Sequence, residues 1–313
     1  MRAAKPAPSH APKPAPNHGP NDGPSAASSH APNAASDPAP TAAPSAVAQA
    51  PAPTVLRQHS GGITLLTLNR PDQRNCLSEA MMSALGEAFA AIAHDSGVRA
   101  VVLAANGPVF CAGHDLKELT GHRRDRDQGR AYFQHIMGTS CALMQSIVRL
   151  PQPVIAAVQG VATAAGCQLV ASCDLAVASS LAGFCTPGVD IGLFCSTPMV
   201  ALTRNVARKQ AMEMLLTGDT VGAEHAARIG LVNRVVAPGA EREEAIKLAR
   251  QIAAKSAMTV RLGKEAFYRQ AEMSLADAYR HACQVMVENM LRPDAAEGIG
   301  AFIDKRKPVW EDH

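Results

Sequence analysis

The chain contains few aromatic residues and lacks several patterns that mark whole classes of protein. Only 4% of its 313 residues are Phe, Trp or Tyr. Its eight cysteines include no CxxC pair and occur in apolar runs, so we expect reduced, buried thiols instead of disulfides or a zinc site. Its 11 histidines form no HxxxH or HExxH pattern, and we therefore expect no bound metal.

Long apolar runs and an excess of one charge are also missing. No apolar stretch approaches the ~20 residues that span a bilayer. The 30 basic and 27 acidic residues give a formal net charge of +3. This balance provides no electrostatic footprint for nucleic acid or for an acidic membrane surface. We expect neither as a partner.

Residues 1–53 lack the side chains that build a core. They hold 13 of the 22 prolines and no aromatic residue, Leu or Ile. Such a segment cannot bury enough apolar surface to offset its chain entropy, which predicts a disordered tail. It has no continuous apolar core of a secretory signal, and few basic residues for a mitochondrial leader. We expect a cytoplasmic location and regard the mitochondrial matrix as the less favoured alternative.

The rest of the chain has the pattern of an α/β protein. Val55–Pro71 predicts a β-hairpin that turns at Gly61-Gly62. Ser78 can cap a helix whose apolar residues fall at helical spacing, namely Met81, Leu85, Phe89 and Ile92. Continuous apolar runs then predict strands covered on both faces: Val98–Ala105, Pro153–Gly160 and Leu175–Ser179. Strands that alternate with helices imply a parallel sheet.

The chain beyond Val236 is predicted to be helical only. Two amphipathic stretches, Arg242–Ala271 and Leu275–Leu291, have apolar faces that must pack on the domain or on a partner subunit. We expect a core domain over residues 54–255 and a helical oligomerisation region over residues 256–313.

The stretch GVATAAGCQLVASCD, Gly160–Asp174, places small residues where a strand passes into a helix. Helix starts expose N–H groups without helical partners and carry partial positive charge. Small residues at 164–166 would let a ligand approach that backbone. The earlier CAGHDL loop offers a second N–H near His114, and two converging donors would form an oxyanion hole. Tight packing of helix on sheet would also explain the small residues.

Six stretches carry a resemblance to a known family, in that family's order and spacing. They are LNRPDQRNCLS, VFCAGHDLKEL, GVATAAGCQLVASCD, FCTPGVDIGL, LLTGDTVGAEHAARIGLVNRVV and FIDKRKPVW. From about Val55 to Trp310 the chain resembles the enoyl-CoA hydratase/isomerase (crotonase) superfamily. The resemblance implies a crotonase fold, with a repeated ββα superhelix core and a C-terminal helical trimerisation region. It also implies a homotrimer or a dimer of trimers.

The resemblance implies lyase activity of the enoyl-CoA hydratase type on an acyl-CoA thioester, in fatty acid metabolism. Coenzyme A is then part of the substrate, and no separate cofactor is expected. By the family pattern, the backbone N–H groups of His114 and Ala165 form the oxyanion hole. The two glutamates with which family hydratases activate water correspond to Gln168 and Gly188. Neither residue can take a proton from water near neutral pH, so hydration is expected to be weak or absent.

Several nearby groups have simpler interpretations than catalysis. The ring of His114 could act as an acid or base, but we favour a role for its backbone alone. Ser196 stands where dienoyl-CoA isomerases carry an aspartate, and Asp190 matches a family acid that we interpret as structural. Residues expected only to line the pocket are Cys185, Cys195, Ser196 and Thr197. Acids suit the helix start after the CAGH turn, which explains Asp115 and Glu118.

Basic residues at two places in the family contact the phosphates and adenine of CoA. The candidates in this sequence are Arg70, Arg74, Lys264 and Lys307. Two alternatives to hydration stay open. Loss of CO₂ from a malonyl-type acyl-CoA would use the same hole and needs no water-activating carboxylate. A non-catalytic acyl-CoA-binding or regulatory protein would keep the binding site alone.

Overall fold

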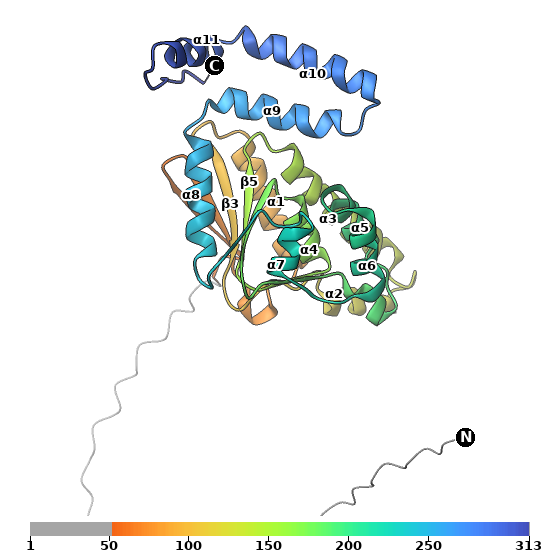
Figure 1. Cartoon of the computed structure of the whole chain (residues 1–313). Coiled ribbons are helices and arrows are strands. Elements are labelled where there is room, and N and C mark those ends of the chain that lie inside the picture. The colour runs from red at the N-terminus through yellow and green to blue at the C-terminus, as the bar shows by residue number, and fades with distance from the viewer. Residues whose placement is uncertain (1–51, 313) are drawn as a thin grey trace, which may run out of the picture. The chain divides into compact units, whose positions relative to one another are not determined.

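The computed structural model describes residues 52–312, which belong to one compact unit (Figure 1). The predicted disorder of residues 1–53 therefore lies outside the described residues, apart from residues 52 and 53. The division at residues 255/256 stays a prediction. In the described part of the chain, no helix is long and apolar enough to cross a membrane.

The larger sheet has six strands and confirms the predicted hairpin and parallel arrangement. Its order is β1-β2-β3-β5-β7-β10. Only the β1–β2 pair is antiparallel. The hairpin turns at Gly61 and Gly62, whose φ angles of 58° and 77° suit glycine. The strands are β1 Val55–Ser60, β2 Ile63–Leu68, β3 Ala100–Ala105, β5 Val154–Val158, β7 Leu175–Ser179 and β10 Arg234–Val236.

A second, four-stranded sheet was not predicted, because its strands are only two or three residues long and carry no readable period. Its order is β4-β6-β8-β9, with β4 Val109–Cys111, β6 Val161–Thr163, β8 Gly183–Cys185 and β9 Val221–Gly222. β4, β6 and β8 each follow a strand of the larger sheet after a short turn and lead toward a helix. This is the repeated ββα unit, and it confirms the predicted crotonase fold.

Helices cover both faces of the larger sheet. Helix α1 (Glu79–Ala93) begins after Ser78, whose hydroxyl accepts from the Met81 N–H at 3.2 Å. Its four predicted apolar residues are all buried, on the same face as α3 (Arg130–Arg149) and α4 (Ala165–Ser172). Helix α8 (Glu241–Ala253) covers the other face with small residues, which pack against alternate residues of β3 and β5 (Figure 1).

Shorter helices connect these layers. They are α2 Leu116–Gly121, α5 Ser196–Asn205, α6 Arg208–Thr217 and α7 Ala223–Arg228, with 3₁₀ turns η1 Pro71–Gln73, η2 His122–Arg124 and η3 Pro187–Ile191. The Asp115 carboxylate caps α2 by accepting from the N–H groups of Lys117 and Glu118.

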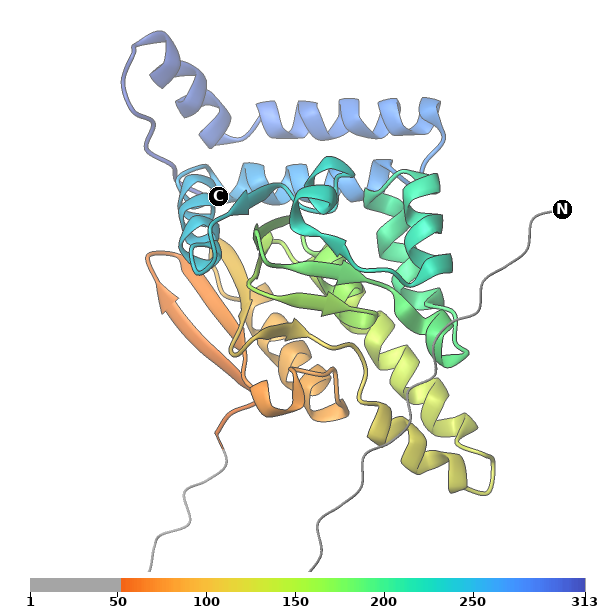
Figure 2. The ribbon, with the colours of Figure 1, turned by 60° about the horizontal axis from the view of Figure 1, so that its bottom comes forward.

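The C-terminal region is helical, as predicted, and exposes many apolar side chains. It contains α9 Ala257–Gln270, α10 Leu275–Met290 and α11 Pro293–Ile303. The first amphipathic stretch is divided between α8 and α9, since Ser256 caps a new helix there. Helices α9 and α10 run side by side in both views (Figures 1 and 2). Large exposed apolar residues include Leu275, Met290, Leu291 and Phe302.

Candidate active site

The two predicted donor loops follow neighbouring parallel strands of the small sheet. β4 pairs with β6, with Val109 opposite Val161. The carboxyl ends of parallel neighbours lie at one edge, so the turn before His114 and the turn before Ala165 meet. A Cβ atom built on Gly113 would lie 3.3 Å from the Ala165 nitrogen. The sequence-predicted pair of loops is therefore brought into contact.

The helix start at Ala165 is held in an unusual backbone conformation. Ala164 has φ 52° and ψ −117°, a region that residues with a side chain rarely adopt. Such strain costs roughly 1–3 kcal/mol and concentrates at functional sites. Among residues 52–312, neither the Ala165 N–H nor the His114 N–H donates a hydrogen bond. Two free donors at adjoining turns are the geometry that an oxyanion hole needs.

Gly166 supplies the close packing that the small residues also suggested. A Cβ atom at this position would lie 2.2 Å from the Cys111 carbonyl oxygen. Helix α4 can therefore approach β4 only because residue 166 is glycine. Gly166 thus confirms the packing interpretation of the small-residue triplet, while Ala165 starts the helix with a free N–H and its role as an oxyanion donor stays a prediction.

Asn75 supports the first loop and was not singled out in the sequence. It is fully buried, and its amide donates to the carbonyls of Asn106 and Val109 at 2.8 and 2.9 Å. Its side-chain oxygen accepts from the Arg70 N–H. These bonds tie the segment before α1 to the segment that enters β4. The signal available for Asn75 was its position as a polar residue between Arg74, which is exposed, and Cys76, which is buried.

Two side chains at the site carry polar atoms without a partner. Gln168 is 4% exposed, and its side-chain oxygen has no hydrogen bond among the described residues. Both ring nitrogens of His114 are likewise buried and unbonded, although the Leu77 carbonyl lies near the ring. Burial lowers the pKa of His114 below its ordinary value, so the ring is neutral at pH 7. Unpaired buried polar atoms usually mark strain or a missing ligand.

The backbone around Gly188, the residue predicted to match the second glutamate, leaves no room for a side chain. A Cβ atom at Gly188 would lie 2.8 Å from the Leu193 carbonyl oxygen and 2.9 Å from the Cys195 sulfur. The Leu193 N–H also donates to the Gly188 carbonyl at 2.9 Å. The segment after η3 thus folds back over Gly188 and occupies the space through which a longer side chain would leave the backbone.

The acidic residues after the first loop have structural partners, and Asp190 lies away from the loops. Asp115 caps α2 and accepts from the Cys76 thiol at 3.4 Å. Burial alone would raise the pKa of Asp115, but the N–H groups of α2 hold it below its ordinary value. Glu118 accepts from the Glu79 N–H. Asp190 is exposed and lies against Gly218, at the end of α6.

Three thiols lie together near Gly188 and α4. Burial raises the pKa of Cys167 to about 12 and also raises the pKa of Cys195. Cys185 donates to the Thr163 hydroxyl at 3.1 Å. Protonated thiols are weak nucleophiles, so these residues suit pocket lining. Two predicted neighbours lie at the start of α5: Ser196, with its exposed hydroxyl bonded to the Phe194 carbonyl, and the half-buried Thr197.

The four candidate CoA contacts lie in different settings. Arg74 is exposed, and its carbonyl accepts from the Ala112 N–H, so it adjoins the first donor loop. Arg70 donates to the Ala52 and Asn69 carbonyls. Lys307 is exposed near the C-terminus. Lys264 is buried and donates to three acceptors within the chain, which leaves its ammonium no donor for a phosphate.

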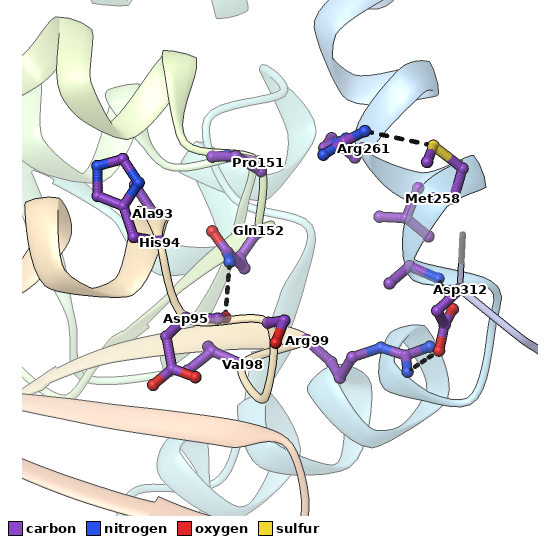
Figure 3. A pocket seen from close by; sticks show the side chains of 13 residues that line it. Ala93, His94, Asp95, Val98, Arg99, Pro151, Gln152, Met258, Arg261 and Asp312 are labelled. Carbon is purple, nitrogen blue, oxygen red and sulfur yellow. Dashed lines mark hydrogen bonds and ion pairs between the residues drawn. The ribbon is translucent and has the colours of Figure 1, made fainter.

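A cavity of about 300 Å³ lies at the opposite edge of the larger sheet (Figure 3). Its lining includes Arg99, which precedes β3, Gln152, which precedes β5, and Arg261 in α9. The donor loops follow the other ends of these strands, so this cavity is separate from the candidate site. Among the described residues, no group of three His, Cys, Asp or Glu side chains could hold a metal.

Comparison with known proteins identifies relatives of the whole described chain. A sequence model described as enoyl-CoA hydratase/isomerase matches residues 58–313. The rat protein "Enoyl-CoA hydratase domain-containing protein 3, mitochondrial" is 47% identical over 267 residues, which are 85% of this chain and 87% of the rat protein. The stretches GHDLKEL, FCTPGVDIGLFCSTP and KRKPVW indicate this same subgroup, and the comparison confirms it.

Two crystal structures extend the likeness to three dimensions. Human enoyl Coenzyme A hydratase domain-containing protein 3 is 47% identical with a TM-score of 0.78, covering 82% of this chain and 100% of the human one. An enoyl-CoA hydratase from Mycobacterium smegmatis is 52% identical with the same TM-score, covering 82% and 99%.

The expectation of a cytoplasmic location is wrong. Relatives from rat, human and frog are all named mitochondrial. The expectation depended on counting basic residues in the N-terminal segment, a composition signal too coarse to decide between compartments. By its sequence match, its fold and the placement of its donor loops, the chain belongs to the enoyl-CoA hydratase/isomerase family.

Proposed function

We propose that the chain binds an acyl-CoA thioester and stabilises its enolate with the backbone N–H groups of His114 and Ala165. The observation that carries the proposal is the contact between Gly113 and the Ala165 nitrogen, which places two unbonded donors at adjoining turns. Negative charge moves onto the thioester oxygen as an enolate forms, and fixed donors stabilise that charge without reorganising. A mitochondrial location for this activity is part of the proposal and is supported by the names of the rat and human relatives.

The proposed site is poorly equipped to catalyse hydration. Gln168 can hold a water molecule by hydrogen bonds but cannot take its proton. No carboxylate can enter at residue 188 unless Leu193 and Cys195 move. The loss therefore involves the surrounding backbone and not only two side chains. General acid–base catalysis contributes typically ~10²–10⁴-fold, and the proposed enzyme lacks that contribution.

Decarboxylation is the second candidate. Loss of CO₂ from a malonyl-type thioester generates the enolate directly and needs no base, so the donor pair would serve for this step, and the enolate carbon then takes a proton from water. The residues at the two predicted glutamate positions, Gln168 and Gly188, favour this reaction, because it needs no carboxylate to activate water.

The proposed assembly is a homotrimer, alone or as a dimer of trimers. Helices α10 and α11 leave Met290, Leu291 and Phe302 mostly exposed, and Phe302 is 84% exposed. Apolar side chains of this size are normally covered. Arg74 and Lys307 are the proposed CoA contacts, since both are exposed and neither side chain has a partner among the described residues.

Hydration and decarboxylation can be measured side by side. With crotonyl-CoA, we expect loss of the enoyl absorbance to be ~10²–10⁴-fold slower than with a hydratase that carries both glutamates, because no group can activate water. Gln168→Glu should not restore the rate, since the position at Gly188 stays closed. Release of CO₂ from malonyl-CoA or methylmalonyl-CoA would identify the second candidate. Hydration at an ordinary rate would contradict the proposal.

Ala165→Pro removes the N–H of one proposed donor. Residue 165 is the first residue of α4, where proline is tolerated. Any turnover through the enolate should fall by about 10²–10³-fold. Arg208→Pro, at the first and exposed position of α6, is the matched control and should keep activity. Equal activity in both variants would exclude Ala165 as a donor.

Gly188→Ala tests whether the second glutamate position is closed. Its Cβ atom would approach the Leu193 carbonyl, so we expect the free energy of unfolding to fall by roughly 1–3 kcal/mol in urea denaturation. Gly86→Ala is the control: its Cβ atom meets nothing within 4 Å inside α1, and alanine should raise stability by up to about 1 kcal/mol. If both variants gained stability, the segment after η3 would not be closed.

Phe302→Glu tests the assembly. A charge on the exposed surface of α11 should prevent the trimer from forming, because an unpaired carboxylate cannot be buried at low cost. Light scattering on the eluting protein would show a trimer or hexamer for the wild type and a monomer for the variant. Glu265→Gln, a polar change on α9, should leave the mass unchanged. A monomeric wild type would refute the proposed assembly.

A further inference from the structure

A buried ionic cluster joins the first C-terminal helix to the core. The Lys264 ammonium lies 2.7 Å from the Asp174 carboxylate, and the two side chains are 7% and 14% exposed. Lys264 also donates to the carbonyls of Ile147 and Gln152, each at 3.1 Å. Tyr268 donates to the other Asp174 oxygen at 2.9 Å. Every donor of the ammonium is therefore satisfied.

Helix α9 has little else to hold it on the core. Apart from the Lys264 side chain, α9 buries no residue fully. Cavities of about 300 and 530 Å³ lie along it, each lined by α9 residues together with core residues. Within residues 52–312, the side-chain hydrogen bonds from α9 to the core are those of Lys264 and Tyr268. A polar cluster thus replaces the apolar interface that usually attaches a helix.

Asp174 also closes the segment that carries the Ala165 amide. Its Oδ2 accepts from the Val154 N–H at 2.7 Å, and its own N–H donates to the Val154 carbonyl at 2.9 Å. Val154 begins β5, and Asp174 follows α4. The residues between them run through β5, β6 and α4, so Val154–Asp174 is a closed unit with Ala165 in its middle and Asp174 at its base.

We infer that Lys264 is a positioning residue for the oxyanion hole, and that through Asp174 it couples the seating of the C-terminal helices to thioester binding. This inference rests on the proposed function. Lys264 was predicted to contact CoA, and we now assign it this positioning role instead. Burial lowers the pKa of Lys264 and raises that of Tyr268, while the Asp174 carboxylate favours the charged ammonium.

The coupling has a simple physical origin. Without the ammonium, the Asp174 carboxylate would remain buried with only the Tyr268 hydroxyl and the Val154 N–H as partners. A buried charge that loses its partner draws in water or moves toward solvent. Either change would loosen the bonds between Asp174 and Val154 that close the base of the unit. The Ala165 N–H, at the other end of α4, would then be less firmly fixed.

The test compares a ligand that has a thioester carbonyl with one that lacks it. Butyryl-CoA and free CoA are titrated by calorimetry into the full chain and into Lys264→Met. We expect butyryl-CoA affinity to fall about 10-fold, as for coupling through packed networks, and CoA affinity to stay within about twofold. The carbonyl stretch of bound butyryl-CoA should also move back toward its frequency in water. A general loss of folding would instead lower the affinities for butyryl-CoA and free CoA by the same factor.

Two further variants keep the test decisive. Tyr268→Phe removes one hydroxyl from the cluster and should shift butyryl-CoA affinity in the same direction by a smaller factor, even if Lys264→Met folds poorly. Lys255→Met removes an exposed lysine that lines the 530 Å³ cavity together with Lys264, and it should leave the affinities for both ligands unchanged. Equal losses for both ligands, or no loss, would overturn the inference. A wild type that binds butyryl-CoA no tighter than CoA would instead refute the proposed function, and the inference with it.

Discussion

The parallel pairing of β4 with β6 is the constraint on which the candidate site depends. These strands are three residues long, and they bring the turns before His114 and Ala165 to one edge. A Cβ atom at Gly166 would clash with the Cys111 carbonyl, and Gly113 has a φ of 82° that favours glycine and would be crowded by a Cβ atom. Gly166 therefore permits a backbone approach that any other residue would prevent. The donor geometry is therefore a property of the main chain, and it survives changes in the side chains around it.

That independence explains how the site can keep one half of its family's chemistry and lose the other. Hydratases need both a carbonyl-binding main chain and carboxylates that handle water. In the proposed site the main-chain half is retained, with a strained Ala164 before the helix. The positions predicted for the two carboxylates hold an amide, Gln168, and a glycine, Gly188, which the Leu193 segment covers. A single substitution cannot add a carboxylate at residue 188 while the backbone fills that space. This favours chemistry that needs no activated water.

The sequence predicted the larger sheet well because its signals are local. The hairpin turn needs two glycines, α1 needs a cap and a period, and buried strands need continuous apolar runs. The second sheet was missed because two or three residues carry no period, although it positions the donors. The donor residues themselves came from the family resemblance, since small residues at a strand–helix junction have two explanations.

Two features depend on contacts that the sequence pattern does not show. Lys264 resembles a surface charge until its partner is known to lie 90 residues earlier. Gly188, predicted to stand where family hydratases carry a glutamate, looks like a point change until Leu193 and Cys195 are seen to fold over it.

The contacts of Asp174 and Lys264 connect the core to the C-terminal helices. Asp174 lies where the segment that carries Ala165 meets the helix that begins the C-terminal region. The position of this side chain therefore depends both on the core and on the surface that covers α10 and α11. In the proposed coupling, Asp174 links assembly to thioester binding, and cavities lie along α9 where apolar contacts would otherwise hold that helix on the core.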